Sequence, residues 1–205
     1  MKIAVIGASG TIGQAVVQAL APRHQVIQVG RSRGEYQVDL ASKHSIQQLF
    51  EAIAPFDAVV SAAGQAKFAP LSALTDEDFQ FSLANKLMGQ VNLVRVGLAY
   101  VTDRGSFTLT SGVLSGEPMP GSAAISLVNA GLEGFMRAAA LEAPRGIRVN
   151  VVSPPWVSET LVAMGQAGSG GLPAAQVAAA YVAAVESQRT GEVLDARSLA
   201  ASTKF

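Results

Sequence analysis

The chain of 205 residues contains no cysteine and only two histidines, His24 and His44. Without thiols it can form no disulfide, and so little imidazole leaves it short of the ligands that a zinc site requires. We therefore expect no metal site, and the chemistry of this protein must come from other side chains or from a bound organic group.

An excess of charge of one sign is also lacking, because 15 basic side chains balance 15 acidic ones. No basic arm or stripe is present, which argues against nucleic-acid binding. No run of about eighteen uninterrupted apolar residues occurs, and the apolar run that starts at Ile3 is too short for a signal peptide. We expect a cytoplasmic protein with no membrane span.

Short apolar strands alternate with helical patterns along the whole chain, and hydrophobic residues make up 49% of it. This alternation predicts a Rossmann-type, doubly wound α/β fold, with a mainly parallel sheet of about seven strands and helices on both faces. The glycine-rich stretch 165–171 is predicted as a mobile loop. The strands that stand out are 3–6, 25–29, 57–61, 106–110, 147–152 and 192–194, and the helices are 12–20, 42–53, 75–101, 122–143 and 173–186.

Three glycines, Gly7, Gly10 and Gly13, fall between the first predicted strand and the first predicted helix. Glycines there allow a tight turn and a close approach of the backbone to a pyrophosphate, which the helix N-terminus then stabilises. A turn that only needs small residues is the alternative, but the position directly after an apolar strand favours a dinucleotide. Residues 1–205 are therefore predicted as one dinucleotide-binding domain, with phosphate contacts from Gly7, Ser9, Gly10, Thr11, Ile12 and Gly13.

The end of the second predicted strand bears on the choice of cofactor. An NAD-binding domain usually places a carboxylate there for the ribose 2′-hydroxyl, whereas this chain reads Gly30-Arg31-Ser32-Arg33. A guanidinium pairs well with the 2′-phosphate of NADP, although solvated loop arginines are the alternative. The sequence predicts NADP(H) in preference to NAD(H), bound in part by Arg31 and Ser32.

Later segments extend this pattern: Ser61-Ala-Ala-Gly64, Phe107-Thr-Leu-Thr-Ser111, Asn150-Val-Val-Ser-Pro-Pro-Trp-Val157 and Thr190-Gly-Glu-Val-Leu-Asp195. Together with the glycine turn they resemble the short-chain dehydrogenase/reductase family nearly end to end. The resemblance implies an oxidoreductase for a small carbonyl or alcohol, assembled as a homodimer or homotetramer through helices 75–101 and 122–143. It also implies catalytic roles for Asn85 and Ser111, and cofactor contacts from Asp39, Leu40, Ala62, Ala63, Gly64, Asn129, Pro154 and Val157.

One departure from the family bears on the mechanism. The Tyr-x-x-x-Lys pair of the family falls on Ile125 and Asn129 here, so the proton donor is missing. Asn129 can still hydrogen-bond a ribose hydroxyl, but it brings no charge. Losing general acid–base catalysis typically costs about 10²–10⁴ in rate.

Other side chains were weighed as replacements for the missing pair. Lys67 follows the predicted strand 57–61 but is better explained as an exposed loop residue, and Glu117 as a solvated one. Lys86 follows Asn85 and would point about 100° away from it on an α-helix. Tyr100 and Arg104 are expected to be structural. Two functions stay open: an oxidoreductase, weak or with a relocated acid, and a non-catalytic NADP(H) sensor or protein-interaction module.

Overall fold

The computed structural model describes residues 1–202, and their strands form one parallel sheet in the order β3-β2-β1-β4-β5-β6-β7. Every pair of neighbouring strands is parallel, as in a doubly wound sheet whose strand order reverses beside β1. The predicted fold class is confirmed. The strands are β1 Lys2–Ile6, β2 Gln25–Gly30, β3 Tyr36–Gln37, β4 Phe56–Ser61, β5 Val101–Thr110, β6 Arg148–Ser153 and β7 Val193–Asp195.

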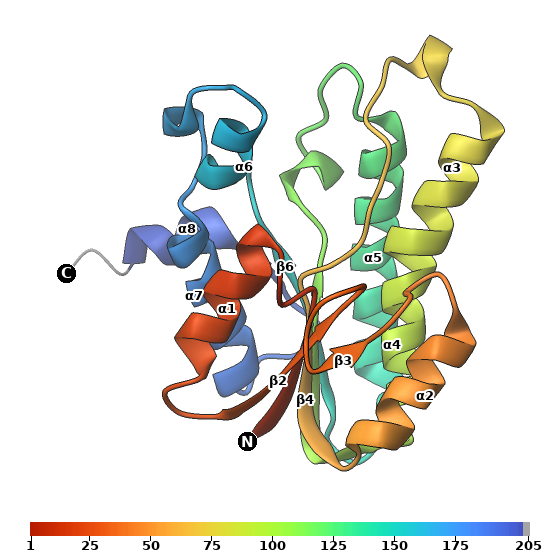
Figure 1. Ribbon diagram of the computed structural model, residues 1–205, viewed down its shortest axis with the longest axis vertical. Coiled ribbons are helices and arrows are strands. Elements are labelled where there is room, and N and C mark those ends of the chain that lie inside the picture. Colours follow the sequence, from red (N-terminus) through yellow and green to blue (C-terminus); the bar gives the residue numbers. More distant parts are fainter. Residues whose placement is uncertain (203–205) are drawn as a thin grey trace.

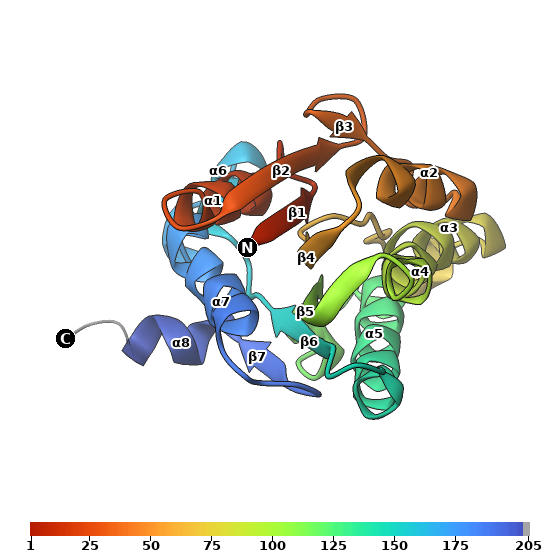
Figure 2. The same cartoon turned by 90° about the horizontal axis from the view of Figure 1, so that it is seen from below.

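Helices cover both faces of this sheet (Figures 1 and 2). In Figure 2, α1 and α7 lie on one face, and α2, α4 and α5 lie on the other. The helices are α1 Thr11–Leu20, α2 Lys43–Ile53, α3 Asp76–Ser82, α4 Gly89–Gly97, α5 Ala123–Glu142, α6 Ser158–Ala163, α7 Ala174–Glu186 and α8 Ala196–Ser202, with short 3₁₀ turns η1 Leu71–Ala73, η3 Val113–Ser115 and η4 Gly168–Gly170.

Two apolar cores hold these layers together, one on each face of the sheet. Successive residues of a strand point to opposite faces, so Ala4 and Ile6 of β1 join one core while Ile3 and Val5 join the other. The rings of Phe50 on α2 and Phe56 on β4 lie 5.0 Å apart in the first core. Burial on both faces explains why the strands are nearly continuous apolar runs.

The helix predicted over 75–101 is wrong in its length and its continuity. Its start is as expected, because Thr75 and Asp78 form a reciprocal capping box at the N-terminus of α3. The helix then passes through a π-helical turn, η2 Leu83–Met88, before it resumes as α4. Residue 101 already belongs to β5, which begins where Val101 pairs with Phe56, five residues before the predicted strand.

Three short elements, β3, α6 and α8, have no counterpart in the prediction, because so few residues show no clear periodicity. The glycine-rich stretch predicted as a loop includes the 3₁₀ turn η4. Within residues 1–202, no helix has both the length and the apolar character that crossing a membrane requires. The same residues contain no group of three or more His, Asp or Glu side chains placed to hold a metal ion.

Candidate functional site

The three glycines after β1 differ in what surrounds them. A Cβ on Gly13 would lie 1.9 Å from the carbonyl oxygen of Gly7, and one on Gly7 would lie 2.7 Å from that of Ala62. These two glycines are therefore required by backbone packing between strand and helix. At Gly10 the nearest atom would be 3.4 Å away, an ordinary contact, and Gly10 lines an open cleft. Gly10 is the position where the absent side chain leaves room for a ligand.

The N-terminus of α1 opens at the same place. Gly10 is its N-cap residue, so no side chain caps the first turn, and that turn contains no acidic residue. The first amides of a helix have no intrahelical partner, and the helix dipole places partial positive charge there. A helix of ten residues that starts uncapped at the edge of a cleft is suited to bind a phosphate group.

The cleft itself measures ≈ 300 Å³ and lies at the carboxyl edge of β1, β2 and β4. This edge, beside the point where the strand order reverses, is where open α/β sheets bind their ligands. Most residues predicted from the sequence to contact the adenosine and the phosphates are brought together here. Those that line the cleft are Gly7, Ser9, Gly10, Arg31, Asp39, Leu40, Ala62, Ala63, Gly64 and Asn85.

The remaining predicted residues lie outside this cleft. Thr11 lines a shallow neighbouring depression together with Ser9. Ile12 and Gly13 belong to the first turn of α1, and Ser32 is exposed in the loop after β2. Pro154 and Val157 are buried in the segment after β6, where the carbonyl oxygen of Pro154 accepts from the amide of Val113 at 3.1 Å.

The loop after β2 places one unpaired cationic side chain, that of Arg31, at the wall of the cleft. Arg31 is exposed, lines the cleft and forms no hydrogen bond or ion pair with any residue that the structure describes. Glu35, the acid nearest in sequence, is turned away, because its carboxylate accepts from the backbone amide of Gln28 at 3.1 Å. The carboxylate of Asp39 accepts from the amide of Ala41 at 3.0 Å at the start of α2. An anionic group in the cleft would find Arg31 available.

A second group of polar residues gathers at the carboxyl end of β5. Asn129 on α5 is buried, and its side-chain amide donates to the carbonyl oxygen of Gly112 at 3.4 Å. Its side-chain oxygen Oδ1 is buried without a hydrogen-bond partner. A buried acceptor without a donor is costly, so Oδ1 is suited to receive a hydroxyl group from a ligand. Asn85 lines the cleft, while its side-chain amide donates to Phe81 O at 3.0 Å.

Ser111, for which the family resemblance implies a catalytic role, is held by Glu133, a residue not predicted from the sequence. Its hydroxyl is buried and donates to the carboxylate of Glu133 at 3.0 Å. Ser115 donates to the same oxygen at 2.6 Å. Glu133 follows Asn129 by four residues and Ile125 by eight, so the three share one face of α5. That spacing is the sequence signal that could have identified it.

Lys86, which follows Asn85 in the sequence, lies in this region as well. It is buried, and its ammonium group donates to the carbonyl oxygen of Ser111 at 3.2 Å. Lys86 and Asn85 both belong to the π-helical turn η2. Burial lowers the pKa of Lys86 to about 8, because desolvation disfavours the charged form.

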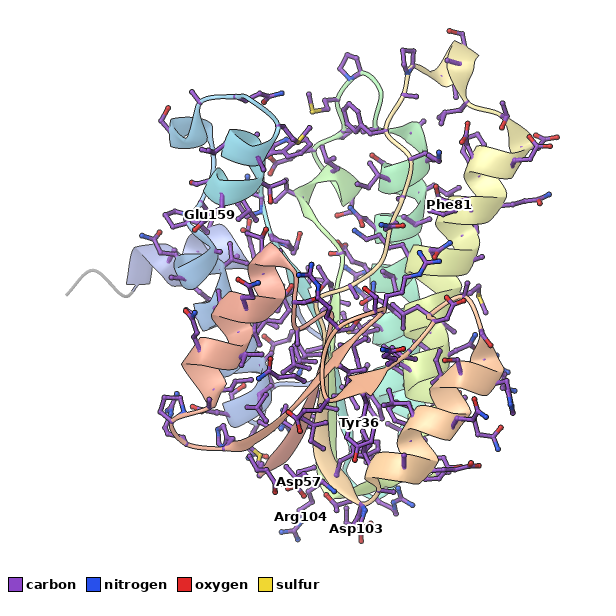
Figure 3. All side chains as sticks on the ribbon, viewed as in Figure 1. Tyr36, Asp57, Phe81, Asp103, Arg104 and Glu159 are labelled. Atoms are coloured by element: carbon purple, nitrogen blue, oxygen red, sulfur yellow. The ribbon has the colours of Figure 1, made fainter. Side chains whose placement is uncertain are left out.

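The other candidates are accounted for by contacts of their own. Lys67 forms an ion pair with Asp78 at 3.4 Å and lies over the ring of Phe81, labelled in Figure 3. Glu117 makes two hydrogen bonds to Arg197, at 2.9 and 2.7 Å. The hydroxyl of Tyr100 donates to Glu51 at 3.4 Å.

Arg104 does not form a helical pair with Tyr100, because it belongs to β5. Figure 3 shows Arg104 with Asp57 and Asp103 at the end of the sheet opposite the loops that form the cleft. The distance from the cleft and the contact between Tyr100 and Glu51 agree with the expectation that both residues are structural.

Four features lie together at the carboxyl edge of the doubly wound sheet: a glycine turn, an uncapped helix N-terminus, an unpaired arginine and a buried unpaired acceptor. Together they define a protein of the dinucleotide-binding class. Comparison with known proteins narrows this class. The family model described as enoyl-(acyl carrier protein) reductase matches residues 3–201. The chain belongs to the short-chain dehydrogenase/reductase family, a family of oxidoreductases that bind nicotinamide dinucleotides.

Two curated relatives show the range of this similarity. A hydroxynaphthalene reductase of Aspergillus fumigatus is 29% identical over 160 residues, which are 76% of this chain and 56% of the relative. A 3-oxoacyl-[acyl-carrier-protein] reductase of Mus musculus is 27% identical over 175 residues, 75% of this chain and 74% of the relative. The chain thus spans little more than half the length of the first of these enzymes.

Solved structures match over nearly the whole chain. The Listeria innocua protein lin1944 is 41% identical with a TM-score of 0.92, covering 95% of this chain and 98% of its own. A small-chain dehydrogenase crystallised in complex with NADPH is 26% identical with a TM-score of 0.84, covering 95% of each chain. The size and layout of this chain therefore recur in other members of the family.

Proposed function

We propose that this chain is an NADP(H)-dependent oxidoreductase that interconverts a small carbonyl compound and the corresponding alcohol. The observation that carries the preference for NADP(H) is Arg31, an exposed guanidinium on the wall of the cleft with no partner among the described residues. The 2′-phosphate that distinguishes NADP from NAD is the kind of group that a guanidinium binds in a two-pronged, charge-assisted manner. The NADPH complex of a similar protein supports the same choice.

The residues of the chain have separate tasks in holding this cofactor. The amides at the start of α1 hold the pyrophosphate, and Asp39 and Leu40 lie at the adenine end of the cleft. Asn129 offers its unpaired Oδ1 to a ribose hydroxyl, and Ala62, Ala63 and Gly64 form the floor. Pro154 and Val157 flank the nicotinamide. When bound, the reduced cofactor supplies a hydride, and the chain must supply the matching proton.

The proton is the difficult part of this proposal. Ile125, at the position of the family's tyrosine, is half-buried and has no proton to give. The hydroxyl of Ser111 already donates to Glu133, so in this arrangement Ser111 can accept a hydrogen bond but has no second proton to offer. The proposed activity therefore needs an acid from elsewhere in the chain.

Cofactor titration tests the first half of the proposal. The purified protein should bind NADPH and NADP more tightly than NADH and NAD, measured by the fluorescence of bound reduced cofactor and by the rise in melting temperature. The second half is tested by NADPH consumption with a panel of small aldehydes, ketones and quinones. Absence of affinity for all four nucleotides would end the proposal, and turnover at background with the whole panel would end its catalytic part.

A second candidate, a sensor or interaction module that binds NADP(H) without chemistry, is favoured by the pair Ile125 and Asn129. It predicts that the native protein is inert and that the double substitution Ile125→Tyr with Asn129→Lys creates reductase activity. The enzyme is favoured instead if the native protein turns over substrate. Part of that turnover should then remain in Asn129→Ala, and it should fall with other substitutions at the carboxyl end of β5.

We further propose that the chain forms a homodimer or homotetramer, with α5 in the interface. The outer face of α5 carries Leu127, which is 49% exposed, and Leu141, which is 89% exposed. Gly134 lies between them with open space where a side chain would be. Apolar and small residues on one exposed face suit close packing of two helices. Light scattering of the native protein and of Leu127→Glu tests this, and a monomeric mass for both would rule it out.

A further inference from the structure

We propose that Lys86 is the relocated catalytic acid, whose ammonium group gives the proton to the oxygen of the carbonyl substrate. This inference rests on the oxidoreductase function proposed above. It assigns to one residue the task that Ile125 leaves vacant and that the family places on α5.

The burial of Lys86 is unusual for its residue type. Lysine is almost never fully buried unless it is paired with an acid, because removing an ammonium group from water is costly. Lys86 is only 9% exposed, and no carboxylate of residues 1–202 lies within ion-pair distance of it. Its one hydrogen bond is to the neutral carbonyl oxygen of Ser111, at 3.2 Å. Two of its three N–H donors therefore have no partner among the residues that the structure describes.

The local backbone is arranged to hold the lysine in this place. Lys86 lies on the π-helical turn η2, and such turns occur frequently at functional sites. Gly64 lies directly against its stem, since a Cβ on Gly64 would come within 3.0 Å of Cγ and 3.1 Å of Cα of Lys86. Gly64 has a φ of +126° and lines the dinucleotide cleft. Asn85, the neighbour of Lys86, lines the same cleft. The stem of Lys86 thus passes behind the wall of the cleft.

The ammonium group ends where the reaction is proposed to occur. Ser111 follows the last residue of β5, at the carboxyl edge of the sheet. Asn129 bonds to the next carbonyl oxygen, that of Gly112, and Ile125 is one turn earlier on the same helix. The ammonium group of Lys86 therefore lies at the carboxyl end of β5, on η2, the helical segment that packs beside α5 (Figure 1).

Several charged side chains on the elements that pack against η2 have partners other than Lys86. On α5, Glu133 is bound by Ser111 and Ser115 and is 3.7 Å from Arg137. On α3, Asp78 pairs with Lys67. On α4, Arg95 donates to Asn92 at 3.3 Å. Burial is accordingly the only cause that lowers the pKa of Lys86, and it brings that pKa to about 8.

An ammonium group with such a pKa is suited to general acid catalysis near neutral pH. In the reduction, for which NADPH would supply the hydride and leave as NADP⁺, a new C–H bond forms at the carbonyl carbon as the C=O π bond breaks. The electron pair of that π bond takes a proton from Nζ of Lys86. The lysine is left as a neutral amine, which burial favours, and it regains a proton from solvent before the next turnover. In the oxidation of the alcohol, the neutral amine accepts the proton instead.

Two substitutions of Lys86 separate proton transfer from charge. Lys86→Met removes both, whereas Lys86→Arg keeps a positive charge that does not give up its proton. We expect NADPH-dependent turnover to fall by about 10²–10⁴ in both variants, with the dissociation constant of NADPH unchanged within about twofold. Lys67→Met, which alters an exposed lysine that is paired with Asp78, is the control and should keep native turnover.

The pH dependence supplies a test that needs no variant and so survives a failure of either variant to fold. The acid must be protonated to act, so the reductase rate of the native protein should fall as pH rises through about 8. NMR of protein labelled with ¹³C at lysine Cε measures the titration of Lys86 directly. The signal of Lys86 is the one that Lys86→Met removes, and it should titrate in the same pH range. If that variant does not fold, the lysine signal with the lowest pKa is followed instead.

Each outcome decides the matter. Native turnover in Lys86→Arg, a rate independent of pH between 7 and 9, or no lysine signal that titrates well below 10 overturns the role of Lys86 and leaves the oxidoreductase intact. A native protein that binds NADPH but reduces no carbonyl compound overturns the oxidoreductase and, with it, this inference.

Discussion

The hydroxyl of Ser111, at the end of β5, donates a hydrogen bond over 3.0 Å to the carboxylate of Glu133 on α5. Ser115 donates to the same oxygen, so one carboxylate ties the loop after β5 to the helix that follows it. This relationship joins two residues that are 22 apart in the sequence and that both face the candidate catalytic edge.

Glu133→Ala should destabilise the protein, because it leaves the buried hydroxyl of Ser111 without its acceptor. The expected cost is about 1–3 kcal/mol in the free energy of unfolding, measured with urea. Glu133→Gln keeps an oxygen acceptor and should cost clearly less. Arg137→Ala removes only an exposed partner of Glu133 at 3.7 Å and should cost under about 1 kcal/mol. Equal effects of Glu133→Ala and Arg137→Ala would show that these hydrogen bonds do not hold the loop.

Arg31→Ala should weaken binding of NADPH about 10- to 100-fold, because it removes one charge-assisted contact of roughly 1.5–3 kcal/mol. Binding of NADH, which has no 2′-phosphate, should change little. Arg33→Ala is the matched control, since Arg33 is exposed in the same loop but does not line the cleft. Titration of each variant with both reduced cofactors is the measurement, and a loss of NADPH affinity in Arg33→Ala alone would reassign the phosphate to that residue.

Gly10→Ala and Gly13→Ala should fail in different ways. A Cβ at Gly13 would meet the carbonyl oxygen of Gly7 at 1.9 Å, so this variant should lose several kcal/mol of stability or fail to fold. A Cβ at Gly10 has room in the protein but enters the cleft, so that variant should keep its melting temperature within a few degrees and bind NADPH at least about tenfold more weakly. Thermal unfolding with and without NADPH separates the two. Unchanged NADPH affinity in Gly10→Ala would place the pyrophosphate elsewhere.

Lys86→Met should make the folded protein more stable at neutral pH, even though we expect it to abolish turnover. The pKa of Lys86 is lowered from 10.5 to about 8 on folding, so below pH 8 the native state carries a buried charge that the unfolded state exposes to water. Between pH 8 and 10.5 the unfolded chain holds this proton and the folded chain does not, so the native protein gains stability as pH rises. The advantage of the variant, roughly 1–3 kcal/mol at pH 7, should shrink over that interval. Urea unfolding at pH 7 and pH 10 measures it, and an unstable variant at both would show that Lys86 is a packing residue.

Much of the fold could be predicted because it is written in local patterns. Apolar strands such as Asp57–Ser61 alternate with helices whose buried positions, such as Ile46, Leu49 and Ile53, recur at helical spacing. The capping box at Thr75 is likewise a local signal. The early start of β5 was missed because pairing of Val101 with Phe56, a contact between distant segments, decides it.

The candidate site divides in the same way. The glycine turn could be predicted from its position after the first strand, since glycine spacing, strand and helix N-terminus are neighbours in the sequence. Lys86 could not, because its importance comes from meeting Ser111 across 25 residues, whereas Glu133 left a signal in its helical spacing from Asn129.

The π-helical turn η2 sets the phase of the whole helical stretch from α3 to α4. Its hydrogen bonds span five residues, one more than in an α-helix. The apolar positions before and after it are therefore offset by one residue from a single continuous heptad pattern. After this turn, Leu93 and Val94 of α4 are both buried in the core. The irregular winding therefore lets one helical stretch bury its apolar side against the sheet while directing a charged side chain inward.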